Sequence, residues 1–401
     1  MRRAIRSRSV RTFAATQFLL EVQFWFPIWL IYLLDLGFSL ATAVLADAVF
    51  RIVSVACELP MGVLADRIGR KRAYLLMCGL TTVTFAAITF ITSTPVLFAA
   101  WIVWGILWAL TSGASAPYLY EICEREGTGI DPARAFGFVR ATGNFAVVCS
   151  LLAAGYLYEA DHRLPFAVTA GLGALALLLA FTLPGVPVHA GTRLSSVLGG
   201  IRGEIGVPAV RRAIWLGALL LLIGWSARIL FQPLALDAGL SAQMTGWMYA
   251  AFAVATVLGS AVSGLVSHRH RRFAVVVAFA SLPLTLLGTA LAPELAPFGF
   301  LPVMGFGYAL GTTAIEILTN EVTSRPVRGA IFGATAAFAG IGIAFARPGL
   351  GLIWEGHSAA YAAGWWALAG LVGLAVALPI ALRDGPSARK RSSSTPDRPT
   401  H

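Results

Sequence analysis

Long apolar stretches alternate with short polar segments throughout the 401 residues of the chain. An α-helix needs about 20 predominantly apolar residues to cross a bilayer, and twelve stretches come close to that length or exceed it. They cover residues 13–34, 42–64, 73–93, 96–118, 136–158, 165–183, 213–235, 243–266, 273–292, 298–320, 327–353 and 359–382. The sequence therefore predicts an all-α transmembrane protein with twelve spans.

One longer polar segment, residues 184–212, separates six spans from the other six. We therefore expect two six-helix bundles, over residues 13–183 and 213–382, joined by this linker. A short tail over residues 1–12 precedes the first bundle, and a tail rich in Ser, Pro and Arg over residues 383–401 follows the second. The second tail has too few apolar residues to bury a core, so we expect it to be disordered.

Composition and charge agree with a membrane protein. Hydrophobic residues make up 58% of the chain and charged residues 12%, which leaves a soluble fold with too little polar surface. Of the 30 Lys and Arg residues, 25 fall on one side of the membrane if the spans alternate in direction, and only Arg163 falls in a loop on the other side. The positive-inside rule therefore predicts a protein of the cell inner (plasma) membrane with both termini in the cytoplasm. The net charge of +11 is explained by topology, and no nucleic-acid partner is expected.

A basic turn, MGVLADRIGRKR at residues 61–72, separates the second and third predicted spans. Its residues match the loop motif of the major facilitator superfamily at Gly62, Leu64, Asp66, Arg67, Gly69, Arg70, Lys71 and Arg72. The chain resembles that superfamily over nearly all of residues 12–383. The resemblance implies a twelve-helix secondary transporter whose two bundles are related by a pseudo-two-fold axis, with substrate bound between them. A weak internal repeat agrees, because an offset of 202 residues places Gly62 on Gly264.

The resemblance also implies a gate at this loop. Gly62 would let a neighbouring helix approach closely. Asp66 would accept hydrogen bonds from the first turn of the eleventh span, which begins near residues 324–328, and would latch the cytoplasmic side while the other side is open. For the basic residues Arg67, Arg70, Lys71 and Arg72, topology and contact with lipid headgroups are the alternative roles.

Charged residues within spans are costly, so they mark candidate functional sites. Glu21 lies in the first span, on one predicted helical face with Gln17, Phe24 and Ile28. Removal from water favours the neutral acid, which makes Glu21 a candidate carrier of a coupling proton. A buried structural carboxylate is the alternative.

Other charged residues have expected partners. Asp47 and Arg51 are four residues apart in the second span, where an ion pair along one helix is expected. Asp47 and Glu316 are further candidates for proton coupling. Arg140 and Arg347 are each expected to neutralise an acid on a neighbouring helix, and topology places the following acids nearest: Glu121, Glu316 and Glu321.

Aromatic and polar residues within spans are candidates to line the substrate cavity. Trp101, Trp104 and Trp108 form a helical stripe in the fourth span, for which helix packing is the alternative role. The ring of Trp225 can hold the guanidinium of Arg228, which could then bind an anionic or carbonyl-bearing substrate; an ion pair with Asp237 or snorkelling to the outer interface is the alternative. The remaining candidates are Gln17, Phe24, Trp25, Gln232 and Tyr308.

These features favour a secondary active transporter that works by alternating access and exports small amphipathic or apolar molecules, coupled to protons. Uptake of a small metabolite is the alternative, and a non-transporting sensor or scaffold on the same fold is a further one. Antiporter signatures are incomplete, because the fourth span holds no Arg and residues 143–155 hold no Pro.

Enzymatic chemistry is not expected. The sequence contains neither an Asp-rich diphosphate-binding motif nor a phosphate-binding loop, and its four Cys residues are scattered, so no cofactor or metal site is expected. The expected partners are a small-molecule substrate, protons and the lipid bilayer, and the protein is expected to be a monomer.

Overall fold

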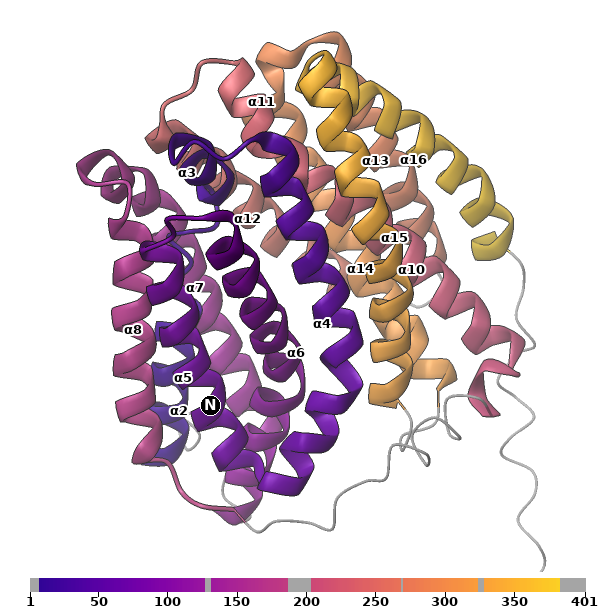
Figure 1. Cartoon of the computed structure of the whole chain (residues 1–401). Helices are drawn as coiled ribbons and strands as arrows, with labels where there is room; N and C mark the ends of the chain where they lie inside the picture. The colour runs from indigo at the N-terminus through magenta and orange to yellow at the C-terminus, as the bar shows by residue number, and fades with distance from the viewer. Residues whose placement is uncertain (1–6, 127–130, 187–202, 268–269, 324–327, 383–401) are drawn as a thin grey trace, which may run out of the picture.

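The computed structural model of the chain describes residues 7–126, 131–186, 203–267, 270–323 and 328–382, and in these ranges all regular structure is helical (Figure 1). Eleven helices in these ranges are long and apolar enough to cross a membrane. They confirm eleven of the predicted spans. The first predicted span has a different structure, described below.

The helices form two halves along the chain. The N-terminal half contains α2 (Arg8–Leu20), α3 (Trp29–Asp35), α4 (Leu40–Ile68), α5 (Arg70–Thr89), α6 (Thr94–Arg125), α7 (Pro132–Ala160) and α8 (Leu164–Phe181). The C-terminal half contains α10 (Pro208–Ala227), the 3-10 turn η1 (Arg228–Leu230), α11 (Phe231–Asp237), α12 (Ala242–Leu265), α13 (Arg271–Leu291), η3 (Pro293–Leu295), the π-helical turn η4 (Ala296–Phe300), α14 (Leu301–Val322), α15 (Arg328–Gly356) and α16 (Ala359–Leu382).

The internal repeat is explicit at one turn of each half. The turn from α3 to α4 contains Gly37 at φ +86°, and the turn from α11 to α12 contains Gly239 at φ +66°; both conformations favour glycine. The next helix in each case has a serine N-cap, Ser39 or Ser241, whose hydroxyl accepts a backbone N–H three residues later. Each pair of positions has the 202-residue offset expected from the sequence.

The first span is interrupted, so its prediction as one continuous helix is wrong. Helix α2 ends at Leu20, and residues 21–28 form turns before α3 begins at Trp29. Pro27 lies in this break, where it has no N–H to continue a helix. The predicted helical face of Glu21, Phe24 and Ile28 therefore does not exist beyond the end of α2.

Two helix pairs join the halves: α7 packs on α12, and α4 packs on α15. We call the end of the helices where α4 meets α5 the linker end, and the end with α3 and α11 the far end (Figure 1). Glycines permit close contact at the far end, because a Cβ on Gly155 would lie 2.2 Å from the Gln243 Cα and one on Gly246 would lie 2.5 Å from the Leu151 carbonyl oxygen. Toward the linker end, α4 and α15 separate (Figure 1).

Gly155→Leu should prevent this far-end closure, because the new side chain meets the backbone of α12 and not a flexible side chain. We expect a spin label at His162 and one at His357, both exposed near the far end, to move apart relative to the unsubstituted protein. Double electron–electron resonance would measure the change. Gly171→Leu is the control, since a Cβ there meets no atom within 4 Å; equal distances in the two variants would contradict the prediction.

Candidate functional site

The break in the first span is stabilised by side chains from other helices. The Gln23 N–H donates to Ser150 Oγ of α7 at 3.0 Å, and the Ser150 hydroxyl donates to the Val147 carbonyl at 2.8 Å. Unpaired peptide groups are costly in the hydrocarbon layer, so Ser150 makes the interruption tolerable on one side. The sequence alone gave no signal for this role.

Gln232 stabilises the other side of the break from the opposite half. Its Oε1 accepts the N–H groups of Leu30 and Ile31 at 2.9 and 3.3 Å, and its Nε2 donates to the Phe26 carbonyl at 3.2 Å. Its side chain is buried, with an exposed fraction of 2%. Gln232 was predicted to line the substrate cavity, but these three bonds engage its amide in joining the two halves.

A cavity of about 340 Å³ adjoins the break and lies within the N-terminal half, among α2, α5, α6 and α8. We call it the tryptophan cavity. Its lining includes three polar side chains and three tryptophans: Gln17, Glu21, Gln23, Trp25, Trp104 and Trp108.

Glu21 is the carboxylate of this cavity. One of its oxygens accepts from Gln17 Nε2 at 3.2 Å, and the other accepts from Gln23 Nε2 at 3.3 Å. Gln17 in turn accepts from the Tyr74 hydroxyl at 3.1 Å. An amide has both donor and acceptor atoms, so the same two glutamines can bond either the ionised or the protonated form of Glu21.

The tryptophans have two different roles. Trp101 is 1% exposed and packs on Trp29 and Trp104; it is not among the cavity-lining residues. Trp104 meets Trp25 edge to face at a ring-centroid distance of 4.6 Å, and both rings line the cavity. Trp108 also lines it and is 38% exposed.

An ion pair joins the halves on α4 and α15. Arg347 Nη1 donates to Asp47 Oδ2 at 2.6 Å, and Arg347 Nη2 donates to the Trp225 carbonyl at 3.0 Å. Both charged side chains are nearly buried. The predicted pair of Asp47 with Arg51 is therefore wrong. Arg347 does neutralise an acid on a neighbouring helix, as expected, but that acid is Asp47 and not one of the three candidates Glu121, Glu316 and Glu321. A partner 300 residues away could not be chosen from helical spacing.

Two further arginines lie on aromatic rings beside this pair. The Arg228 guanidinium carbon is 4.3 Å from the Trp225 ring centroid, which confirms the predicted contact, and 4.8 Å from that of Phe26. The Arg51 guanidinium carbon lies 5.5 Å from the centroid of the same Trp225 ring and 5.4 Å from that of Phe50. The alternative ion pair of Arg228 with Asp237 is not formed, because Asp237 accepts from Trp354 Nε1 and the Ala359 N–H.

These residues form what we call the arginine cluster: Arg51, Arg228 and Arg347, with Asp47 as their nearby acid. Among the described residues, the Nε atom of each arginine is buried and makes no hydrogen bond. Aromatic faces stabilise cations by up to about 2 kcal/mol when water is excluded, which is less than the cost of burying a charge. The cluster therefore retains an excess of positive charge that favours an anion.

Rings connect the arginine cluster to the tryptophan cavity. Phe26 contacts Trp25 of the cavity wall at 5.2 Å and lies beneath Arg228. Phe50 contacts Trp104 at 5.0 Å and lies beneath Arg51. Arg228 and Arg51 are thus each separated from the cavity wall by one aromatic side chain.

The remaining cavity and coupling candidates lie elsewhere. Phe24 is half-buried in the break of the first span. Tyr308 packs so closely on α10 that a Cβ at Gly224 would lie 2.4 Å from its ring. Glu316 lines a second cavity, of about 420 Å³, in the C-terminal half with Thr312 and Asn320.

The basic turn is held within the N-terminal half. Asp66 forms an ion pair with Arg70, and Arg70 Nε also lies 3.6 Å from Glu121. Gly69 connects α4 to α5 at φ +89°, which favours glycine, and Lys71 donates to the carbonyls of Phe181 and Leu183 beyond α8.

The latch between Asp66 and the eleventh span stays a prediction, because the start of that span lies partly outside the described residues. A Cβ on Gly62 would meet no atom within 4 Å, so none of the described helices approaches closely there. Arg67 and Arg72 are exposed. Residues 324–327, at the predicted start of the eleventh span, lie outside the described residues.

Comparison with known proteins gives a family and several relatives. The sequence model of the Major Facilitator Superfamily matches residues 13–236 and 214–401. The chain is 28% identical over 365 residues to the class C tetracycline resistance protein of Escherichia coli, covering 87% of this chain and 88% of that protein. The quinolone resistance protein NorA of Staphylococcus aureus is 24% identical over 157 residues, 39% of each chain.

Of two further comparisons, one covers only part of the chain and the other shows the fold alone. The MFS-type transporter YxaM of Bacillus subtilis (strain 168) is 28% identical over 140 residues, and the alignment spans about a third of its length, at 34%. The crystal structure of the nucleoside transporter NupG superimposes with a TM-score of 0.76 over 94% of this chain and all of that chain, at 15% identity. That likeness supports the fold.

The buried pair gives a stability prediction. Asp47→Asn should lower the free energy of unfolding by about 3–5 kcal/mol, because it leaves Arg347 buried without a counter-charge. Unfolding in detergent would measure it, and adding Arg347→Gln should recover part of the loss. The control is Asp131→Asn, which disrupts the exposed pair with Arg134 but keeps a capping side chain, and should change stability by about 1 kcal/mol or less. A loss no larger in Asp47→Asn than in the control would refute the assignment.

Proposed function

The chain belongs to the Major Facilitator Superfamily, and we propose that this transporter is a proton-coupled exporter of small amphipathic or apolar molecules. The relatives named for tetracycline and quinolone resistance support export. The observation that carries the proposal is Glu21, a carboxylate held by two amides in a cavity with aromatic walls.

We assign the linker end to the cytoplasm, because the Lys and Arg residues concentrate there. With that orientation the far-end contacts of Gly155, Gly246 and Gln232 close the outer side. The Asp47–Arg347 pair closes it as well. Opening toward the outside would have to break these contacts, which makes them the outer gate of an alternating-access cycle.

Glu21 is the proposed proton carrier. A charged carboxylate inside a span is costly, and protonation removes that charge. Gln17 and Gln23 can bond both forms, so Glu21 can gain and lose a proton without losing its place in the cavity. Proton binding and cargo binding would then compete for the same walls, which is the requirement of an antiporter.

The tryptophan cavity is the proposed site for the apolar part of the cargo. Trp25, Trp104 and Trp108 offer flat aromatic walls that can accept varied shapes. The arginine cluster is the proposed selector of a negative charge or carbonyl group, reached when Phe26 or Phe50 turns aside.

We also propose that Asp66 changes partners during the cycle. In the conformation described here it is paired with Arg70. When the outer side opens and the linker ends approach, its carboxylate would be available to the first turn of α15, where a helix dipole favours an anion.

Proton coupling is tested by Glu21→Gln in proteoliposomes. The neutral amide has the shape of the protonated acid, so we expect cargo exchange to persist while movement driven by a proton gradient is abolished. Dye efflux and pH-sensitive fluorescence would measure the two processes. Glu124→Gln, at an exposed acid near the linker end, is the control. Full gradient-driven transport by Glu21→Gln would exclude the role, and loss in Glu316→Gln would transfer it there.

Anion selection is tested by Arg228→Gln with a panel of aromatic carboxylates and their uncharged amides. We expect KM for the acids to rise about tenfold, which corresponds to about 1.4 kcal/mol, while KM for the amides changes little. Arg134→Gln, at an exposed arginine, should leave both series unchanged. An equal loss for acids and amides would mean that Arg228 stabilises the fold and does not select cargo.

A further inference from the structure

A small pocket lies at the linker end of the C-terminal half, away from the tryptophan cavity and the arginine cluster. Its volume is about 110 Å³, and it is bounded by α10, α13, α14 and α16. All its lining residues lie near the ends of these helices, since α10 begins at Pro208, α13 begins at Arg271, α14 ends at Val322 and α16 ends at Leu382. With the linker end in the cytoplasm, this depth corresponds to the inner headgroup layer.

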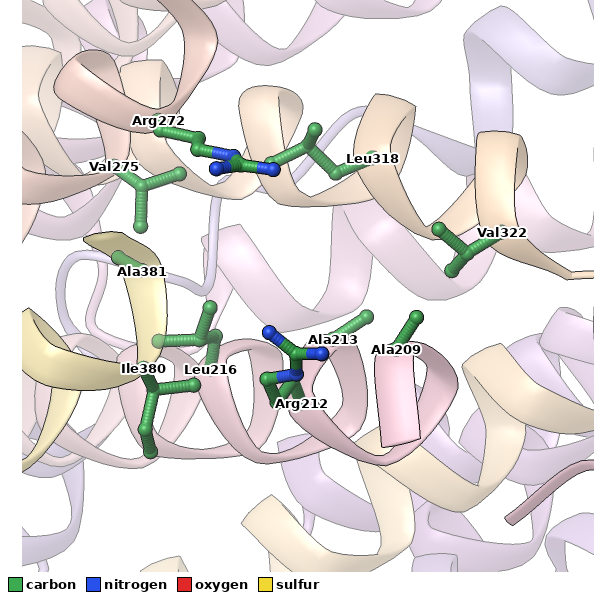
Figure 2. A pocket seen from close by; sticks show the side chains of 10 residues that line it. All are labelled: Ala209, Arg212, Ala213, Leu216, Arg272, Val275, Leu318, Val322, Ile380 and Ala381. Carbon is green, nitrogen blue, oxygen red and sulfur yellow. The ribbon is translucent and has the colours of Figure 1, made fainter. Parts of the chain in front are cut away.

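Two guanidinium groups extend into this pocket from opposite walls, Arg212 from α10 and Arg272 from α13 (Figure 2). Arg212 is positioned by a bond from its Nε to the Pro208 carbonyl at 3.2 Å. The other eight lining residues are apolar, among them Leu216, Val275 and Ile380, and no acid is among the ten. Both arginines lie close to the start of their helices, where the helix dipole adds to the positive potential.

The positive-inside bias explains why arginines lie at this end of the helices, but it does not explain why Arg212 turns into the pocket. Arg211, the neighbour of Arg212, is exposed and would satisfy that bias from the surface. The N-terminal half has no such pair, since the 202-residue offset places Arg272 on Arg70 but Arg212 on Val10. The pocket is therefore a feature of one half and not a consequence of the shared fold.

We propose that the Arg212/Arg272 pocket binds the phosphate group of an anionic phospholipid from the inner leaflet. Guanidinium groups form paired hydrogen bonds with phosphate oxygens, and basic pockets between spans on the cytoplasmic side bind lipid headgroups. The volume suits a phosphate, and the acyl chains would extend along the exposed apolar residues that follow two lining residues in the chain, Phe273 after Arg272 and Leu382 after Ala381. A free phosphate ion shares the same chemistry but would gain nothing from the apolar walls. The proposal rests on the membrane orientation and not on the cargo.

Native mass spectrometry of the full chain in detergent tests the site, with phosphatidylglycerol, phosphatidylcholine of the same acyl chains, and inorganic phosphate as probes. We expect phosphatidylglycerol to bind more tightly than phosphatidylcholine, and the preference to fall about tenfold in Arg212→Gln/Arg272→Gln. The control Arg134→Gln/Arg211→Gln removes two exposed arginines, so it has the same net charge as the test variant and should retain the preference. A Tm shift on lipid addition gives a second measurement, because a ligand of the folded state raises Tm.

Four outcomes would overturn the proposal. An Arg212→Gln/Arg272→Gln variant that keeps the full preference would show that the lipid binds elsewhere, and an equal loss in Arg134→Gln/Arg211→Gln would show a general charge effect. Inorganic phosphate that raises Tm as much as phosphatidylglycerol would identify a free anion as the ligand. If the Arg212→Gln/Arg272→Gln variant does not fold, Arg212→Lys/Arg272→Lys retains the charge without the forked geometry, and an unchanged preference there would exclude paired phosphate bonding. All of these readouts measure binding, so they are independent of whether the protein exports the proposed cargo.

Discussion

A peptide group inside the hydrocarbon layer must find a hydrogen-bond partner within the protein, and the interrupted first span makes this constraint decisive here. The break at residues 21–28 leaves backbone groups that α2 and α3 cannot satisfy themselves. Ser150 of α7 bonds one of them, and Gln232 of the opposite half bonds three more. The interruption that places Glu21 in the cavity therefore also fastens the two halves together at the far end.

Closure of the far end combines contacts of different kinds. The amide of Gln232 bonds backbone, the glycines at 155 and 246 admit backbone against backbone, and Asp47 meets Arg347 as opposite charges. Breaking all of these contacts at once is unfavourable unless a ligand stabilises the open form by more than the contacts stabilise the closed form. The arginine cluster lies beside the ion pair, so an anion that enters there could offset the loss of Asp47 as a partner for Arg347.

Sequence reasoning reached the family, eleven of the twelve spans and the basic turn, because each depends on local composition or spacing. Charges and aromatic stripes inside spans are conspicuous, and the structure places Glu21 and Trp104 in the lining of the tryptophan cavity and Arg228 on the Trp225 ring; their roles in transport stay predictions. The interruption of the first span could not be placed, as one Pro bends some helices and breaks others. Partners across the halves were inaccessible for another reason: Asp47 has an arginine one turn away in sequence, yet the fold brings Arg347 closer.

The two halves share their turns but not their interior chemistry, and contacts on the pseudo-two-fold axis explain why. Leu30 bonds Gln232, and Phe26 lies beneath Arg228; in each pair the residues are 202 positions apart, the offset of the repeat. Equivalent residues that touch each other must lie next to the axis. Identical residues there would put arginine against arginine, or place two glutamine side chains where one now lies against the backbone of the other half. In each pair the two halves have diverged to one polar and one apolar residue. The C-terminal half supplies the amide of Gln232 or the charge of Arg228, and the N-terminal half supplies the backbone or ring that contacts it.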